Sequence, residues 1–153
     1  MKISAQEFRD QLAAHTPRQR LIFVGMSGVG KSHWSTRLAS RYDYRLIELD
    51  ELIGNAPELK SLVQDYPGKD NAEKLGRYFG MPWEPGFAER EQKLLAVERR
   101  LLQSDFPLDA MLDLGGSVIY SPEEMTRLAA TGLVIYLSAG QAEEERMLRT
   151  FLA

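Results

Sequence analysis

The sequence contains no cysteine, and only two of its 153 residues are histidine. The absence of cysteine excludes disulfide bonds, thiolate catalysis and zinc sites built on cysteine, and it fits a reducing compartment. No apolar run approaches the roughly 20 residues that a membrane-spanning helix needs. The N-terminal stretch MKISAQEFRDQLAAH is too charged for the core of a signal peptide. We therefore expect a cytoplasmic protein.

A strong charge of either sign is also missing. The chain has 19 Lys and Arg against 22 Asp and Glu, for a formal net charge of −3. Such a balance argues against electrostatic capture of nucleic acid or of an anionic membrane. A chain of this length can bury about two thirds of its unfolded surface around one core. We expect one domain over residues 1–153, with a small molecule rather than a nucleic acid or a membrane as its partner.

What the sequence does contain is an alternation of short apolar runs with segments of helical spacing. The apolar runs, each expected to form a strand, are Leu21–Val24, Arg45–Asp50, Met111–Leu114 and Leu133–Leu137. Helices are predicted after the first run, over Phe87–Leu102, and over Pro122–Ala130 with Ser121 as the N-cap. Strands that alternate with helices predict an α/β fold with a parallel sheet covered on both faces.

Two segments lie outside this alternation. The first is residues 1–17. The capping-box spacing of Ser4 and Glu7 predicts that this segment is a helical appendage that ends before Pro17. The second, Gly54–Gly86, contains four of the seven prolines and is long for a connection between two elements. It is expected to be a substrate-binding or lid-like insertion. Its aromatic residues could equally form a small satellite core.

The clearest motif is GMSGVGKS, Gly25 to Ser32, which lies between the first predicted strand and a helix. This is the P-loop pattern, in which glycines let successive N–H groups point at an anion near a helix N-terminus. Lys31 would reach the β- and γ-phosphates, and the Ser32 hydroxyl would bind Mg²⁺. The expected nucleotide-binding residues are Gly25, Met26, Ser27, Gly28, Val29, Gly30, Lys31, Ser32 and His33. Trp34, next to them, is expected to pack rather than to hold a base.

Carboxylates follow the second predicted strand. Glu48 and Asp50 are two residues apart, so on a strand both would point the same way, into the crevice at the carboxyl ends of the parallel strands. One of the two would help Ser32 hold Mg²⁺ while the other faces an acceptor hydroxyl. Of the two, Asp50 is favoured for a functional role, with Lys31 as the catalytic pair. Alternatively, both acids are solvated residues where a strand gives way to a helix.

The third predicted strand ends in LDLGGSVI. Gly115 and Gly116 would let a backbone turn expose N–H groups to a substrate at the mouth of the same crevice. The alternative is an ordinary turn from strand to helix. Asp113 is ranked below Asp50 as a functional acid, because Leu114 would separate it from the end of the crevice.

Together these motifs resemble the shikimate kinase family. The resemblance runs from about Leu21 to Tyr136, through GMSGVGKS, ELDELIG, GFAEREQKLL, LGGSV and GLVIYL. It implies a three-layer P-loop NTPase fold with strand order 2-3-1-4, ATP and Mg²⁺ as cofactors, and transfer of the γ-phosphate to a metabolite hydroxyl. It also implies that Asp50 contacts the substrate and that Glu48 replaces an aspartate near magnesium.

The sequence departs from the family pattern at the acceptor end. Ala88 stands where the family has an arginine that pairs with the shikimate carboxylate, and Leu114 replaces the first of three glycines. The chain ends about where an arginine-bearing lid would begin, with Arg146 and Arg149 as candidates for its stem, and the lid and last strand are expected to be absent. A different polyol or hydroxy acid is therefore a credible acceptor.

Two other functions remain open at this point. One is an ATP-binding protein without kinase activity, which uses nucleotide occupancy as a switch and Gly54–Gly86 as a contact surface for a partner. The other is a gluconate-kinase-like or nucleotide kinase, which would share the same P-loop layout.

Overall fold

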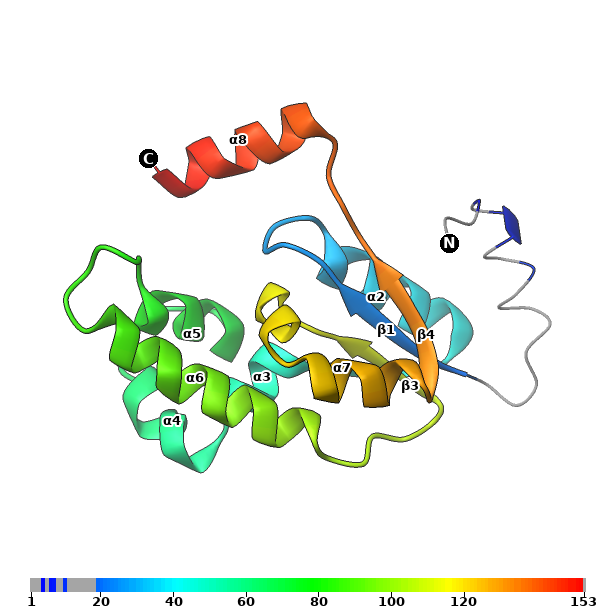
Figure 1. Ribbon diagram of the computed structural model, residues 1–153, viewed down its shortest axis with the longest axis horizontal. Helices are drawn as coiled ribbons and strands as arrows, with labels where there is room; N and C mark the ends of the chain where they lie inside the picture. Colours follow the sequence, from blue (N-terminus) through cyan, green and yellow to red (C-terminus); the bar gives the residue numbers. More distant parts are fainter. Residues whose placement is uncertain (1–3, 5, 8–9, 11–18, 153) are drawn as a thin grey trace.

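The computed structural model describes residues 4, 6–7, 10 and 19–152, and its centre is a parallel sheet (Figure 1). The strands are β1 (Arg20–Val24), β2 (Arg45–Glu48), β3 (Ala110–Asp113) and β4 (Gly132–Tyr136), in the order β2-β3-β1-β4. Ile22 at the middle of β1 pairs with Leu112 on one side and Val134 on the other. The predicted fold class and strand order are confirmed.

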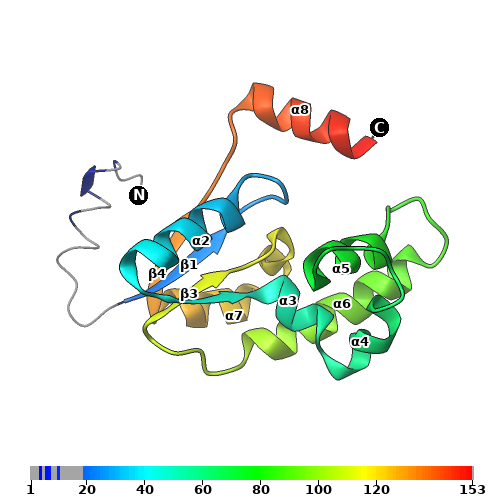
Figure 2. The same cartoon turned by 180° about the vertical axis from the view of Figure 1, so that it is seen from behind.

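Helices cover both faces of the sheet. Helix α2 (Lys31–Tyr42) lies on one face, and α6 (Phe87–Leu102), α7 (Pro122–Ala129) and the short 3₁₀ helix η1 (Gly116–Tyr120) lie toward the other (Figures 1 and 2). In α2 the residues buried against the sheet are Lys31, Ser35 and Ala39, which are spaced four apart. Trp34 is 49% exposed, so the expectation that it packs is wrong.

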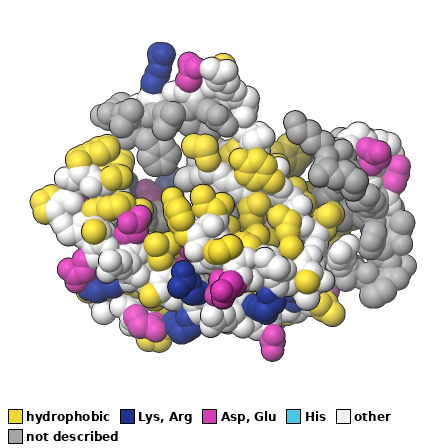
Figure 3. Space-filling view, viewed as in Figure 1, with side chains coloured by type: hydrophobic (Ala, Val, Ile, Leu, Met, Phe, Trp, Pro, Cys, Tyr) yellow, Lys and Arg dark blue, Asp and Glu magenta, His cyan; other side chains and the backbone are white. Residues whose placement is uncertain are grey.

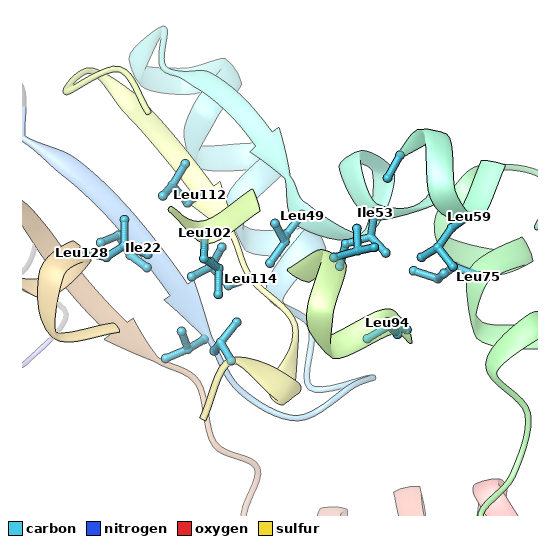
Figure 4. Packing of buried hydrophobic residues seen from close by; sticks show 14 of the residues in the cluster. Ile22, Leu49, Ile53, Leu59, Leu75, Leu94, Leu102, Leu112, Leu114 and Leu128 are labelled. Carbon is cyan, nitrogen blue, oxygen red and sulfur yellow. The ribbon is translucent and has the colours of Figure 1, made fainter. Parts of the chain in front are cut away.

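Alternate residues of the central strands face the two layers. Leu21 and Phe23 of β1 pack in the cluster on the α2 side, whereas Ile22 belongs to a larger cluster on the opposite face. Figure 4 shows that this larger cluster continues from the sheet, through Leu49 and Ile53, to Leu59 and Leu75. A strand buried on both faces explains why LIFV is a continuous apolar run.

The segment after β2 is helical and belongs to the core. It forms α3 (Leu49–Gly54), α4 (Pro57–Val63) and α5 (Asn71–Phe79), whose residues Leu59, Val63 and Leu75 are buried in the larger cluster. Of its aromatic residues, Tyr78 is buried in this same cluster and Trp83 is 66% exposed. The aromatic residues therefore do not form a separate core. Tyr66 joins Tyr78 through an edge-on ring contact of 5.7 Å.

Most of the predicted element boundaries agree with the structure to within a residue or two. Helix α6 has the predicted bounds, and Ser121 is the N-cap of α7, although its side chain makes no capping hydrogen bond. The largest difference is in the second strand, which ends at Glu48 rather than at Asp50 because Leu49 already begins α3.

Helix α8 (Gln141–Leu152) follows β4 through residues 137–140 and lies apart from the sheet and from the other helices in both views (Figures 1 and 2). In the appendage predicted over residues 1–17, Ser4 and Glu7 exchange the two capping-box hydrogen bonds, at 2.6 and 3.2 Å. Most of that appendage lies outside the described residues.

The surface carries mixed charge. On the face seen in Figure 3, hydrophobic side chains gather across the middle, and Lys and Arg side chains lie among Asp and Glu rather than in a patch of one sign. Within the part of the chain that the structure describes, no helix is both long enough and apolar enough to span a membrane.

Candidate active site

The phosphate-loop residues Gly25–Ser32 connect β1 to α2, and glycines determine their backbone path. Gly25 has φ of 152°, and a Cβ there would lie 2.4 Å from the carbonyl oxygen of Leu137. Gly30 is the N-cap of α2 in the left-handed conformation, with φ of 94°. These are conformations that L side chains rarely adopt, so the loop depends on glycine at both positions.

Replacing Gly25 with alanine is expected to lower the free energy of unfolding by about 1–3 kcal/mol, since the new methyl group would overlap backbone atoms that cannot move aside. Urea denaturation measures this change. The matched control is Gly76→Ala in α5, where a Cβ meets nothing within 4 Å. That variant should gain about 0.5–1 kcal/mol, because alanine is the better helix former. Equal stability of the two variants would contradict the packing argument.

A cleft of about 290 Å³ lies beside the phosphate loop. Most of its lining was predicted from the sequence: Ser27, Gly28, Gly30, Lys31, Ser32, His33, Glu48 and Asp50. Two further residues, Ala72 and Asp113, complete it. Of the other predicted site residues, Gly25, Met26, Val29, Gly115 and Gly116 are not part of this lining.

Lys31 lies over the phosphate loop. Its Nζ donates a hydrogen bond of 2.9 Å to the carbonyl oxygen of Met26, and the residue is only 9% exposed. Burial lowers the pKa of Lys31, and the nearby carboxylates of Asp113 and Asp50 oppose that shift. The ammonium group is thus held at the loop by one backbone carbonyl and by acids on two other elements.

Asp113 is part of the site, so the expectation that Leu114 would separate it from the crevice is wrong. It ends β3, is 6% exposed, and accepts a hydrogen bond of 3.1 Å from the hydroxyl of Ser35 in α2. β3 lies next to β1, so its carboxyl end opens on the crevice that holds the phosphate loop. An acid at the carboxyl end of the strand next to the phosphate-loop strand was the feature of the sequence that could have indicated Asp113. Ala72 gave no such signal, since it comes from α5.

Glu48 and Asp50 both line the cleft, but not for the reason predicted. The alternation of a strand does not relate them, because β2 ends at Glu48 and Asp50 lies in the first turn of α3. Burial raises the pKa of Asp50, while Lys31 opposes the shift. Burial and the charge of Asp113 raise the pKa of Glu48. A cluster of acids in one cleft favours the proton-bound or cation-bound form of each.

The Gly115–Gly116 turn lies beside the cleft. A Cβ at Gly115 would be 3.5 Å from Oδ1 of Asp50, and a Cβ at Gly116 would be 3.3 Å from the carbonyl oxygen of Gly25. Gly115 has an ordinary extended backbone, with φ of −66°. A Cβ at Gly115 would make ordinary van der Waals contacts, whereas a Cβ at Gly116 would be slightly tight against the backbone of the phosphate loop. Close approach of the turn to the loop therefore concerns Gly116 rather than Gly115.

Two residues near the start of α6, Ala88 and Arg90, differ in their surroundings. Ala88 is exposed on the first turn of α6. Arg90 donates hydrogen bonds to the carbonyl oxygens of Phe79 and Pro85, both at 2.9 Å, and pairs with Glu84 at 3.2 Å. Its guanidinium thus joins the end of α5 to α6 and is engaged within the protein.

The residues of the cleft fit a nucleotide phosphate with magnesium. The glycine path keeps Cβ atoms out of the loop, and the N-terminus of α2 lies directly behind it. Among the described residues no three acidic or histidine side chains form a complete cation site. Mg²⁺ commonly uses one or two protein carboxylates together with substrate phosphates, so Ser32 and Glu48 would suffice in the presence of a nucleotide.

The sheet order and the loop at its carboxyl edge define an α/β protein with a P-loop kinase fold. The chain belongs to the shikimate kinase family, whose family model matches residues 27–149. It is similar to the shikimate kinase of Stenotrophomonas maltophilia, with 28% identity over 134 residues, covering 87% of this chain and 63% of that protein. The shikimate kinase of Legionella pneumophila is 30% identical over 132 residues, covering 86% and 64%.

A solved structure supports the fold. The crystal structure of shikimate kinase from Bacteroides thetaiotaomicron superposes with a TM-score of 0.51 at 21% identity, covering 86% of this chain and 66% of that chain. The present chain thus spans slightly less than two thirds of the length of the two curated relatives described above.

Proposed function

We propose that this protein is an ATP-dependent kinase that transfers the γ-phosphate of ATP to a hydroxyl group of a small metabolite. The observation that carries the proposal is the cleft that Lys31 and Ser32 of the phosphate loop line together with Glu48, Asp50 and Asp113. Membership of the shikimate kinase family supports it.

The donor end uses the phosphate loop. Lys31 holds the β- and γ-phosphates, and Ser32 with Glu48 holds the magnesium ion. Asp113 keeps Ser35 and the start of α2 in place through its hydrogen bond, and its charge supports the ammonium form of Lys31. Bound Mg-ATP supplies the phosphoryl group and neutralises part of its charge.

The acceptor end uses Asp50. Its carboxylate accepts the proton of the acceptor hydroxyl or orients that hydroxyl for attack. Burial raises the pKa of Asp50, and a raised pKa brings a carboxylate closer to the range in which it acts as a general base.

The insertion Gly54–Gly86 covers the acceptor in this proposal. Ala72 of α5 lines the cleft, and its backbone N–H donates a hydrogen bond of 3.0 Å to Glu51 of α3, the neighbour of Asp50. A movement of α5 would therefore be transmitted to the helix that carries Asp50.

The acceptor is a neutral polyol rather than shikimate. Lys31 is the one lysine or arginine among the described residues that line the cleft, and it serves the nucleotide. Arg90 is engaged with backbone carbonyls, and Ala88 offers no charge. Among the described residues that line the cleft, an acidic acceptor would therefore meet three carboxylates and no cation other than Lys31.

A phosphate-transfer screen tests the function. The protein is incubated with Mg-ATP and, in separate reactions, with shikimate, neutral polyols, hydroxy acids, nucleosides or no acceptor, and ADP release is followed. We expect acceptor-dependent release with a polyol and none above background with shikimate. Turnover with shikimate would refute the acceptor class. Mg-ATP binding without acceptor-dependent turnover on any compound would instead support the nucleotide-dependent switch.

A further inference from the structure

A fully buried carboxyl group lies beside the proposed active site without a role in the scheme above. Glu98 of α6 has no exposed surface. Its Oε1 accepts a hydrogen bond of 2.6 Å from the hydroxyl of Ser117 in η1, and its Oε2 has no hydrogen-bond partner. An ionised carboxylate is costly in such surroundings, so a purely structural position would favour an apolar residue.

Glu98 lies next to a turn that runs between Asp50 and the phosphate loop. A Cβ at Gly115 would lie 3.5 Å from Oδ1 of Asp50 and 3.9 Å from Oε1 of Glu98. The next residue, Gly116, lies against the carbonyl oxygen of Gly25 and the Cα of Met26. Met26 in turn accepts the hydrogen bond of Lys31.

We propose that Glu98 is a positioning residue, which in its neutral form holds the turn Gly115–Ser117 between Asp50 and the phosphate loop. Its Oε1 anchors Ser117, and Ser117 fixes the two glycines before it, of which Gly115 lies beside Asp50 and Gly116 lies beside the phosphate loop. The catalytic consequence rests on the proposed kinase function, whereas the anchoring of the turn does not.

The charge of Glu98 determines whether this anchor is stable. Burial raises the pKa of Glu98, the charge of Asp50 on α3 raises it further, and the hydrogen bond from Ser117 on η1 lowers it. The group is therefore neutral below this raised pKa and ionised above it. Ionisation would place a second negative charge near Asp50, with no hydrogen-bonding partner for Oε2. The turn is expected to loosen as the pH rises through that pKa.

The anchoring is tested without any activity measurement. The backbone amide resonances of Gly115, Gly116 and Ser117 are followed by NMR from pH 5 to pH 9 in the wild type and in Glu98→Gln. The amide variant keeps an oxygen acceptor for Ser117 but cannot ionise. We expect these resonances to titrate in the wild type and to lose that transition in Glu98→Gln. The control is Glu58→Gln, which neutralises an exposed glutamate on α4. The carboxylate of Glu58 pairs with Arg100, which lies on α6 as Glu98 does.

Kinetics with the acceptor found by the screen test the catalytic part. Ser117→Ala and Glu98→Leu each remove the hydrogen bond, and each should lower kcat/KM for the acceptor by about tenfold, the effect of losing one positioning hydrogen bond. Glu98→Gln should retain most of the wild-type kcat/KM, because its amide oxygen can still accept the hydrogen bond from Ser117. The wild-type activity should decline at alkaline pH as the turn loosens, and Glu98→Gln should not show that decline. Thermal unfolding of each variant shows whether it is folded.

The two arms separate failure of this inference from failure of the kinase proposal. If no compound is phosphorylated, the kinase proposal fails, and the NMR titration still decides whether Glu98 anchors the turn. An identical amide titration in the wild type and in Glu98→Gln would overturn the inference. So would a folded Glu98→Leu variant with unchanged kcat/KM and an unchanged pH profile.

Discussion

Replacing Lys31 with alanine is expected to weaken Mg-ATP binding by about 10- to 100-fold, because hydrogen bonds to charged groups contribute roughly 1.5–3 kcal/mol each. Lys31 is the one lysine or arginine lining the described cleft, so no other side chain there can replace its charge. Isothermal titration calorimetry with a non-hydrolysable ATP analogue measures the change. Turnover should fall at least as far, since the same ammonium group faces the transferring phosphoryl group.

The control for this experiment is Lys60→Ala, which removes an exposed lysine on α4 outside the cleft. It should leave the ATP affinity within experimental error. Burial lowers the pKa of Lys31, so the folded protein disfavours its charged form, and its removal should not lower the melting temperature appreciably. A folded Lys31→Ala protein with wild-type affinity would refute the assignment of the phosphate loop.

Replacing Asp50 with asparagine is expected to reduce kcat for the acceptor by about 10²- to 10⁴-fold, the range supplied by a positioned general base. The substitution preserves the shape of the side chain and removes its basicity, so the affinity for Mg-ATP should change far less than kcat. Steady-state kinetics with the polyol acceptor, together with calorimetry for the nucleotide, separate the two effects.

Glu51→Gln provides the matched control for Asp50. It removes a neighbouring negative charge from the same helix turn, but the Glu51 carboxylate accepts a hydrogen bond from the backbone of Ala72 and is not part of the cleft lining. Its kcat should stay within severalfold of the wild type. The Asp50→Asn substitution should not lower the melting temperature, because burial already disfavours the ionised carboxylate of Asp50. A wild-type kcat in Asp50→Asn would show that Asp50 takes no part in the phosphoryl transfer.

The elements that the sequence predicted well are those with a strong local pattern. LIFV cannot be a helix of useful length and is apolar throughout, as a strand buried on both faces must be. The spacing of apolar residues in Phe87–Leu102 specified α6 with both of its ends. The boundary between β2 and α3 was missed because residues 46–53 are apolar or acidic throughout, and no Gly, Pro or Asn marks the point at which the strand ends.

Side-chain relations across the fold were beyond the sequence. Glu98 belongs to a helical pattern in which a charged residue is expected to face solvent, yet packing of α6 against η1 buries it completely. Arg90 is likewise a charged residue of α6, but its guanidinium donates hydrogen bonds to the carbonyl oxygens of Phe79 and Pro85. The burial of Glu98 depends on contacts between separate elements, whereas Arg90 binds the end of α5 and the loop that precedes its own helix.

By itself the sequence determined the alternation of strands and helices and the glycine path of the phosphate loop. Both are local properties: the periodicity of apolar residues selects the element, and the absence of a Cβ permits the loop conformation. Only the tertiary structure decided that Asp113 joins Glu48 and Asp50 in the cleft with Lys31, and that Glu98 lies beside the Gly115–Ser117 turn. Those relations join residues from α2, α3, α6 and β3. The burial that raises the pKa of Asp50 and of Glu98 exists only once these elements have packed.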